Sequence, residues 1–138
     1  MPVLAAHSPS DCFDCAIEAS RIALTYMTPV ILLSDLYVAN GAEPWKIPNV
    51  SELPAIDTKF ADPDEELIVY KRDPETLART QAIPGQAGLE HRIGGLEKSE
   101  DGAVSYDPEN HEKMSRLRVD KINGIAKSYD PIAKKKEK

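Results

Sequence analysis

Two cysteines, Cys12 and Cys15, form a Cys-x-x-Cys pair, the spacing found in redox dithiols and in zinc sites. A redox dithiol of this Cys-x-x-Cys pattern follows a strand and opens a helix, where the helix dipole lowers the thiol pKa. Too little chain precedes Cys12 to supply such a strand. A structural zinc site needs four ligands, and His7 is the one nearby histidine, because His91 and His111 lie far along the chain. We therefore interpret the two cysteines as small apolar residues on a helix.

Glu90, His91 and Arg92 form the local group of greatest chemical interest. A histidine beside a carboxylate could titrate near neutral pH, but the flanking glycines favour a hydrogen-bonded turn. The pair Gly94 and Gly95 lacks the spacing of a phosphate-binding loop. The sequence thus predicts no catalytic, cofactor-binding or metal-ligating residue. It offers Trp45 with Glu90, His91 and Arg92 as candidate interface residues.

The first elements that the sequence predicts are a helix and a strand. Ser8 is expected to cap the helix, with Pro9 at its first position and Asp11 completing a capping box. After Thr28 and Pro29, the apolar run of residues 30–33 is typical of a strand buried on both faces. Ser34 and Asp35 follow at its carboxyl end, where α/β proteins often bind ligands, although a loop or helix-cap role is favoured for Asp35.

No second parallel strand is evident in the sequence. A single strand leaves its backbone donors and acceptors without partners. We therefore expect the chain to be a fragment of a larger α/β subunit.

Residues 40–106 are expected to be mostly irregular. Prolines recur there about every ten residues, and residues 66–70 could form one short edge strand. A long irregular segment is unusual inside a compact domain, so we expect it to wrap a neighbour. Its apolar anchors would be Trp45, Ile47, Leu53, Phe60, Tyr70, Ile83 and Leu89.

A second helix is expected to begin after Asp107. Asp107 is the predicted cap, Pro108 takes the first helical position, and the helix continues to about Lys127. Its apolar side would be formed by Met114, Leu117, Ile122 and Ile125, and its surface pairs by Glu109 with Lys113 and Glu112 with Arg116.

The charge distribution excludes some classes of partner. Residues 1–70 carry 3 basic and 11 acidic side chains, whereas residues 71–138 carry 14 and 12. The basic run at residues 134–138 is expected to be a solvated tail. Nucleic-acid binding requires clustered positive charge, which is missing. No apolar stretch approaches the ~20 residues that span a membrane, and no secretory signal opens the chain, so we expect a cytoplasmic protein.

Three stretches in this order resemble the alpha subunit of 2-oxoacid:ferredoxin oxidoreductases, most closely the 2-oxoglutarate type. They are Thr28-Pro29 with the run to Asp35; Arg72-Asp73-Pro74-Glu75 followed by Ile83-Pro84-Gly85 and Gly88-Leu89-Glu90-His91; and Ser105-Tyr106-Asp107-Pro108-Glu109-Asn110-His111 continuing to Lys121. The resemblance covers nearly the whole chain.

The resemblance implies an enzyme complex. Such enzymes decarboxylate a 2-oxoacid on thiamine diphosphate, pass electrons through an iron–sulfur cluster to ferredoxin, and release an acyl-coenzyme A. The beta subunit, with the diphosphate, magnesium and cluster, would be the direct partner. The thiamine motif and the thiamine-contacting glutamate of the family lie upstream of this sequence, so no catalytic residue is carried over and the chain alone is expected to be inactive.

The resemblance also predicts three segments. Residues 1–39 would end the pyrimidine-binding thiamine domain, residues 40–106 would connect two domains, and residues 107–138 would begin a transketolase-like C-terminal domain with a lysine-rich tail. The fold class expected is α/β. The alternatives are a non-enzymatic module that wraps a partner protein and, less favoured, a Cys-x-x-Cys redox protein.

Overall fold

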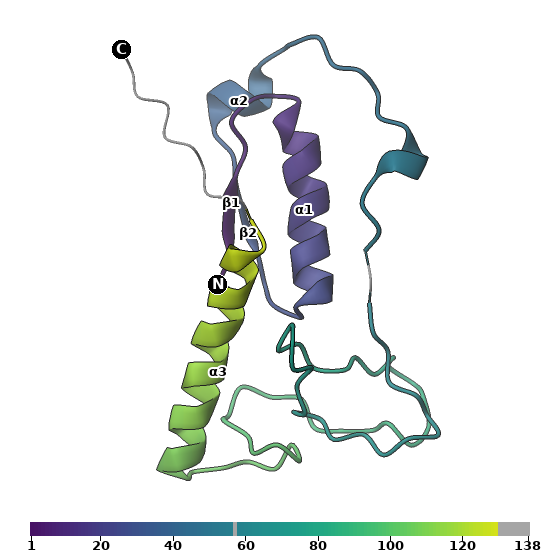
Figure 1. Ribbon diagram of the computed structural model, residues 1–138, viewed down its shortest axis with the longest axis vertical. Coiled ribbons are helices and arrows are strands. Elements are labelled where there is room, and N and C mark those ends of the chain that lie inside the picture. Colours follow the sequence, from purple (N-terminus) through teal and green to yellow (C-terminus); the bar gives the residue numbers. More distant parts are fainter. Residues whose placement is uncertain (57, 130–138) are drawn as a thin grey trace.

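The computed structural model describes residues 1–56 and 58–129 and has a mixed α/β fold built on a small parallel sheet (Figure 1). β1 (Val3–Ala5) leads through α1 (Asp11–Thr25) into β2 (Ile31–Leu33). Val3 lies opposite Ile31 and Ala5 opposite Leu33. Parallel neighbours need a crossover connection, and α1 supplies it. The predicted α/β class is confirmed.

β1 corrects two expectations. The sequence was interpreted as having no second parallel strand and too little chain before Cys12 for one, yet β1 pairs with β2. A strand of three residues is too short for an alternating pattern to reveal it. The strand at residues 31–33 is also not buried on both faces, because its side chains are 39%, 41% and 51% exposed. α1 contacts the sheet but leaves these three side chains only partly covered.

α1 begins two residues later than predicted. Pro9 lies in a turn, and the helix starts at Asp11 with Ser10 as its cap residue. The Ser8 hydroxyl still accepts a hydrogen bond from the Asp11 N–H at 3.4 Å, and the Asp11 carboxylate accepts one from the His7 N–H at 2.9 Å. The capping residues are therefore used, but in the turn that precedes the helix.

The segment after β2 opens with α2 (Leu36–Asn40), which the sequence did not predict. The Asp35 side chain caps it by accepting from the Val38 N–H at 2.8 Å, so the cap interpretation of Asp35 is confirmed. One 3-10 turn follows, Val50–Glu52.

The rest of the connector is irregular, as expected, apart from the isolated bridges Phe60 with Gln81, Arg72 with Arg79 and Lys98 with Val104. The predicted edge strand at residues 66–70 is wrong. The Lys71 N–H bonds to the Ile68 carbonyl at 3.1 Å, which closes a turn there.

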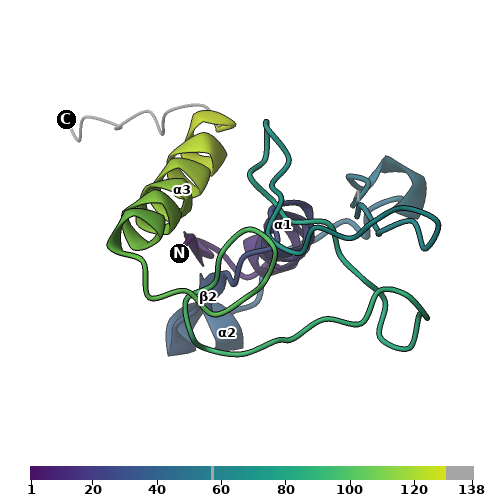
Figure 2. The same cartoon turned by 90° about the horizontal axis from the view of Figure 1, so that it is seen from below.

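α3 (Pro108–Lys127) forms as predicted. Asp107 caps it by accepting from the Glu109 N–H at 3.0 Å. The Glu112–Arg116 pair is present at 2.5 Å, but Lys113 pairs with Glu100 of the connector at 3.3 Å and not with Glu109. From the loops under α1, α3 returns toward the sheet (Figures 1 and 2).

The core is small and divided among the elements. Its buried apolar side chains are Ile22, Val38, Val69, Ala78, Leu89, Met114 and Ile125. Several large apolar side chains are strongly exposed, among them Leu36, Tyr37, Ile47, Ile93 and Tyr106. Leu89 is thus buried in the chain itself, whereas Trp45, Ile47, Phe60 and Ile83 of the predicted anchors remain open for contacts elsewhere.

Candidate functional site

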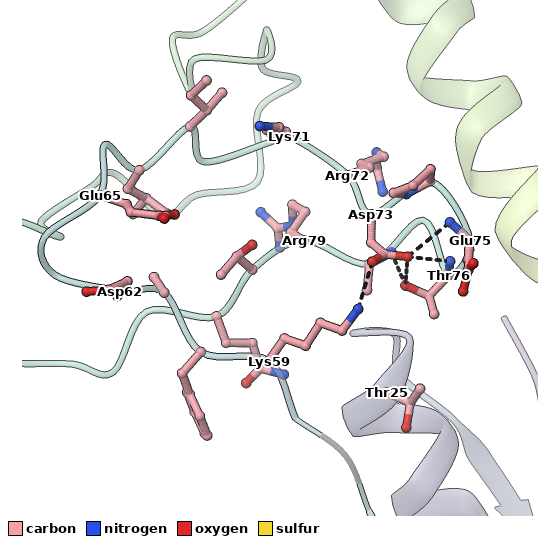
Figure 3. Close-up of a pocket in the computed structure, with 18 of the residues that line it drawn as sticks. Thr25, Lys59, Asp62, Glu65, Lys71, Arg72, Asp73, Glu75, Thr76 and Arg79 are labelled. Carbon is pink, nitrogen blue, oxygen red and sulfur yellow. Dashed lines mark hydrogen bonds and ion pairs between the residues drawn. The ribbon is translucent and has the colours of Figure 1, made fainter.

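A cavity of about 730 Å³ lies between the C-terminal end of α1 and connector residues 59–81 (Figure 3). Its volume falls within the range of small-molecule sites. Both signs of charge line it, with the cations Lys59, Lys71, Arg72 and Arg79 and the carboxylates Asp62, Glu65, Glu66, Asp73 and Glu75. Because the two signs are nearly balanced, this cavity has no preference for a ligand of one charge.

Asp73 organises the turn at one wall of this cavity. Its carboxylate accepts hydrogen bonds from the Glu75 N–H at 3.0 Å, the Thr76 N–H at 2.8 Å and the Thr76 hydroxyl at 3.0 Å. Lys59 Nζ adds an ion pair at 2.9 Å (Figure 3). The Thr76 N–H, followed by Lys59, holds the pKa of Asp73 well below its usual range. The ionised carboxylate therefore fixes the turn of residues 73–76.

Arg72 has only neutral partners in the described chain. Its Nη1 donates to the Leu77 carbonyl at 3.1 Å, and its Nη2 lies 3.9 Å from the Met114 sulfur on α3. Its Nε is buried without a hydrogen-bond partner. Burial, followed by the charges of Arg79 and Arg118, lowers the pKa of Arg72. A buried donor without a hydrogen-bond partner is costly, so Arg72 is the least satisfied cation of this region.

Arg79 is held firmly by its neighbours. The backbone of Arg79 forms an antiparallel bridge with Arg72, and a second bridge, between Phe60 and Gln81, holds the same segment. The guanidinium carbon lies 4.5 Å from the centre of the Tyr70 ring, which is within the range of a cation–π contact. Stacking occupies the face of the guanidinium and leaves its in-plane N–H donors available.

Lys121 brings a third positive charge from α3. It is 8% exposed, and its Nζ donates to the Tyr26 carbonyl at 2.8 Å beyond the end of α1. Burial, with Arg72 and Arg79 nearby, lowers the pKa of Lys121 to about 8. Arg72, Arg79 and Lys121, here named the cation cluster, have no ion pair with any described carboxylate.

The predicted interface residues do not come together. Trp45 stacks on Phe13 of α1, with ring centres 5.3 Å apart, whereas His91 and Arg92 line a smaller cavity with Met27, beyond the other end of α1. The Glu90 carboxylate accepts from the Gly88 N–H at 2.8 Å, and His91 Nδ1 donates to the Leu89 carbonyl at 2.9 Å. These bonds agree with the hydrogen-bonded turn that the sequence favours. An interface role for the four residues stays a prediction.

The Cys-x-x-Cys pair follows a strand and opens a helix after all, because β1 precedes it. Yet burial, followed by the hydrogen bond to Asp11, raises the pKa of Cys15 to about 11. A reactive thiol needs the opposite shift. Cys12 Sγ donates to the Ser8 carbonyl at 3.6 Å and Cys15 Sγ to Asp11 at 3.4 Å. The geometry therefore disfavours a redox dithiol.

Across residues 1–56 and 58–129, no three His, Cys, Asp or Glu side chains are grouped to hold a metal ion. No helix of that part has the length and apolar character to cross a membrane. The lysine-rich tail at 134–138 lies outside the described residues.

Sequence reasoning missed the cation cluster and Asp73. The cluster joins residues 72, 79 and 121, and its assembly depends on α3 packing against the connector, which no local pattern reveals. The local signal that indicates the Asp73 turn is Asp73 followed by Pro74, a pair typical of turns.

The comparisons with known proteins all identify relatives among the 2-oxoacid oxidoreductases. Residues 1–109 match the family described as pyruvate flavodoxin/ferredoxin oxidoreductase, thiamine diphosphate-binding. The 2-oxoglutarate oxidoreductase subunit KorA of Mycobacterium tuberculosis is 60% identical over 124 residues, which are 89% of this chain and 19% of the relative. The 2-oxoglutarate synthase subunit KorA of Methanothermobacter marburgensis is 30% identical over 120 residues, 86% of this chain and 31% of the relative.

A solved structure supports the same likeness. The 2-oxoglutarate:ferredoxin oxidoreductase of Magnetococcus marinus, with 2-oxoglutarate, coenzyme A and succinyl-CoA bound, superimposes with a TM-score of 0.83 at 30% identity. The match covers 94% of this chain and 22% of that chain. The chain thus spans between about a fifth and a third of the length of these relatives.

Proposed function

The chain belongs to the family of thiamine-diphosphate-binding domains of pyruvate flavodoxin/ferredoxin oxidoreductases, and from this premise we propose that it is part of the alpha subunit of a 2-oxoglutarate:ferredoxin oxidoreductase. The complex would convert 2-oxoglutarate to an acyl-coenzyme A and pass electrons to ferredoxin. The predicted resemblance to this family is confirmed.

The observation that carries the proposal is the 60% identity over 124 residues to a 2-oxoglutarate oxidoreductase subunit. The likeness in fold, at a TM-score of 0.83 over 94% of the chain, supports it independently of that relative. The match extends through the irregular connector, where no common helix or strand would by itself produce similarity.

Within that enzyme, we propose that this chain supplies scaffold and subunit contacts. Residues 1–39 would end the pyrimidine-side thiamine domain, residues 40–106 would link it to the next domain, and residues 107–138 would begin that domain. The exposed side chains of β2 support this role, because a two-stranded sheet is rarely stable alone. Further strands of the same subunit would extend the sheet.

Cofactors and partners follow from the family and not from residues of this chain. Thiamine diphosphate supplies the electron sink that 2-oxoacid decarboxylation requires. The described residues show no carboxylate cluster for its metal ion, and we assign none of them a contact with thiamine. Magnesium, an iron–sulfur cluster, a beta subunit, ferredoxin and a cytoplasmic location remain part of the proposal.

Neither alternative is favoured. The interaction-module hypothesis does not account for the match to an oxidoreductase subunit over 89% of the chain. The redox-dithiol hypothesis conflicts with the raised pKa of Cys15.

The proposal is tested with the complete protein that carries this chain, purified with its partner subunit. We expect coenzyme A-dependent reduction of a viologen dye with 2-oxoglutarate, and a much slower rate with pyruvate at the same concentration. Equal rates would refute the 2-oxoglutarate assignment, and no reduction with any 2-oxoacid would refute the enzyme class.

A further inference from the structure

A second cavity, of about 220 Å³, opens beside the connector and carries only positive charge. Arg79 and Arg92 line it together with His91, and no aspartate or glutamate is among the lining residues. It differs in this from the larger cavity, where five carboxylates face four cations. The remaining walls are largely apolar, with Leu67, Val69 and Ile93.

The position of Arg79 is fixed before any ligand arrives. Two backbone bridges hold its segment, and the Tyr70 ring stacks under its guanidinium at 4.5 Å. A preorganised guanidinium loses little freedom on binding, and its paired N–H groups match the two oxygens of an oxyanion. Tyr70 also lines this cavity, so the stacked guanidinium lies at its wall.

Arg79 also lines the larger cavity with its five carboxylates, but among the described residues it forms an ion pair with none of them. Arg72 bonds only to a carbonyl and a thioether, and Lys121 bonds to a carbonyl. Burial together with Arg72 and Arg79 depresses the pKa of Lys121 to about 8, as expected for a cation surrounded by cations. By contrast, Arg21, Arg116 and Arg118 each pair with a glutamate.

We propose that Arg79 of the cation cluster and Arg92 form a binding site for a small oxyanion, either a carboxylate or a phosphate group. Apolar walls strengthen the attraction by lowering the local dielectric constant. The volume lies below the about 300–1,000 Å³ of sites for drug-sized ligands, so the site takes an oxyanion group and not a whole cofactor. This site is independent of the proposed enzyme activity.

Equilibrium dialysis of the complete protein against radiolabelled inorganic phosphate tests the site, with ionic strength held constant by chloride. We expect saturable phosphate binding, one class of which Arg79→Gln weakens about tenfold or more. Arg92→Gln, at an exposed position where folding is not at risk, also weakens it. The matched control is Arg116→Gln, because that exposed arginine is paired with Glu112 outside the cavity.

Competition by acetate then distinguishes the two sources of the oxyanion. Displacement of phosphate at comparable concentration identifies a site that accepts carboxylates, whereas resistance to acetate identifies a phosphate site. Binding that is unaffected by both Arg79→Gln and Arg92→Gln, or the absence of saturable binding of either anion, would overturn the proposal.

Discussion

Replacing Asp73 with alanine is expected to loosen the turn that presents Arg72 and Arg79. The carboxylate accepts from two backbone N–H groups, as a helix cap does, and loss of such a cap costs about 0.5–2 kcal/mol. The ion pair with Lys59, whose side chain is 67% exposed, adds only about 0.2–1 kcal/mol. Asp73→Ala should therefore lower the free energy of local opening by about 1–3 kcal/mol.

Hydrogen exchange of the connector measures this free energy directly. The Leu77 N–H, which donates to the Asp73 carbonyl at 2.9 Å, is a reporter within the turn. Asp73→Asn keeps one acceptor oxygen and should lose about 1 kcal/mol or less. The control is Asp62→Ala, because Asp62 accepts from one backbone N–H, at 3.0 Å.

The pH dependence of the same exchange gives a second readout. The pKa of Asp73 is depressed in the folded state below its ordinary value of 3.8. Its stabilisation is therefore complete above pH 3.8 and is lost as the pH falls through the lower folded pKa. Asp73→Asn should remove this dependence. Equal protection of the turn in Asp73→Ala and Asp62→Ala, or an unchanged pH profile in Asp73→Asn, would refute the reasoning.

Three further predictions concern the cap, a glycine and a thiol. Asp107→Ala should destabilise the first turn of α3 by about 1 kcal/mol, measured by hydrogen exchange, and protection equal to that of the parent would count against the cap. Gly102→Ala should lower the free energy of unfolding by more than about 1 kcal/mol, because the φ of Gly102 is +92° and an added Cβ would lie 3.3 Å from Val69. Gly95→Ala is the control, since a Cβ there meets nothing within 4 Å. Similar losses in the two variants, measured by thermal unfolding, would contradict this prediction. The pKa of Cys15 is about 11 instead of 9.0, which lowers its thiolate population about 100-fold but raises the nucleophilicity of each thiolate about tenfold. Iodoacetamide should therefore alkylate Cys15 about ten times more slowly than a reference thiol. A faster rate would favour the redox alternative.

Local sequence signals predicted α3 and failed at the sheet. Asp107 and Pro108 form a cap and a first helical turn within neighbouring residues, so the sequence alone places the start of α3 correctly. The same reasoning at Ser8 and Pro9 placed the helix start two residues too early, because the Glu43 carboxylate, from beyond α2, accepts a hydrogen bond from the Ser10 N–H at 2.5 Å. A capping contact of that range has no local signature.

The second strand and the cation cluster could not be predicted without the three-dimensional fold. β1 was not predicted, because three residues show no strand pattern by themselves and become recognisable as a strand only through their pairing with β2. The cation cluster was missed because Lys121 approaches Arg72 and Arg79 only after α3 returns along the connector. The resemblance to an oxidoreductase family was predictable, since it depends on the order of short motifs and not on how they pack.

The most direct test of this account compares two proteins in the viologen assay with 2-oxoglutarate and coenzyme A. One is the complete alpha subunit with its beta subunit, and the other is the 138-residue chain with the same beta subunit. We expect turnover for the first and none for the second, because the role proposed for the chain is scaffold and subunit contacts and not catalytic groups. Turnover by the second mixture would contradict the account.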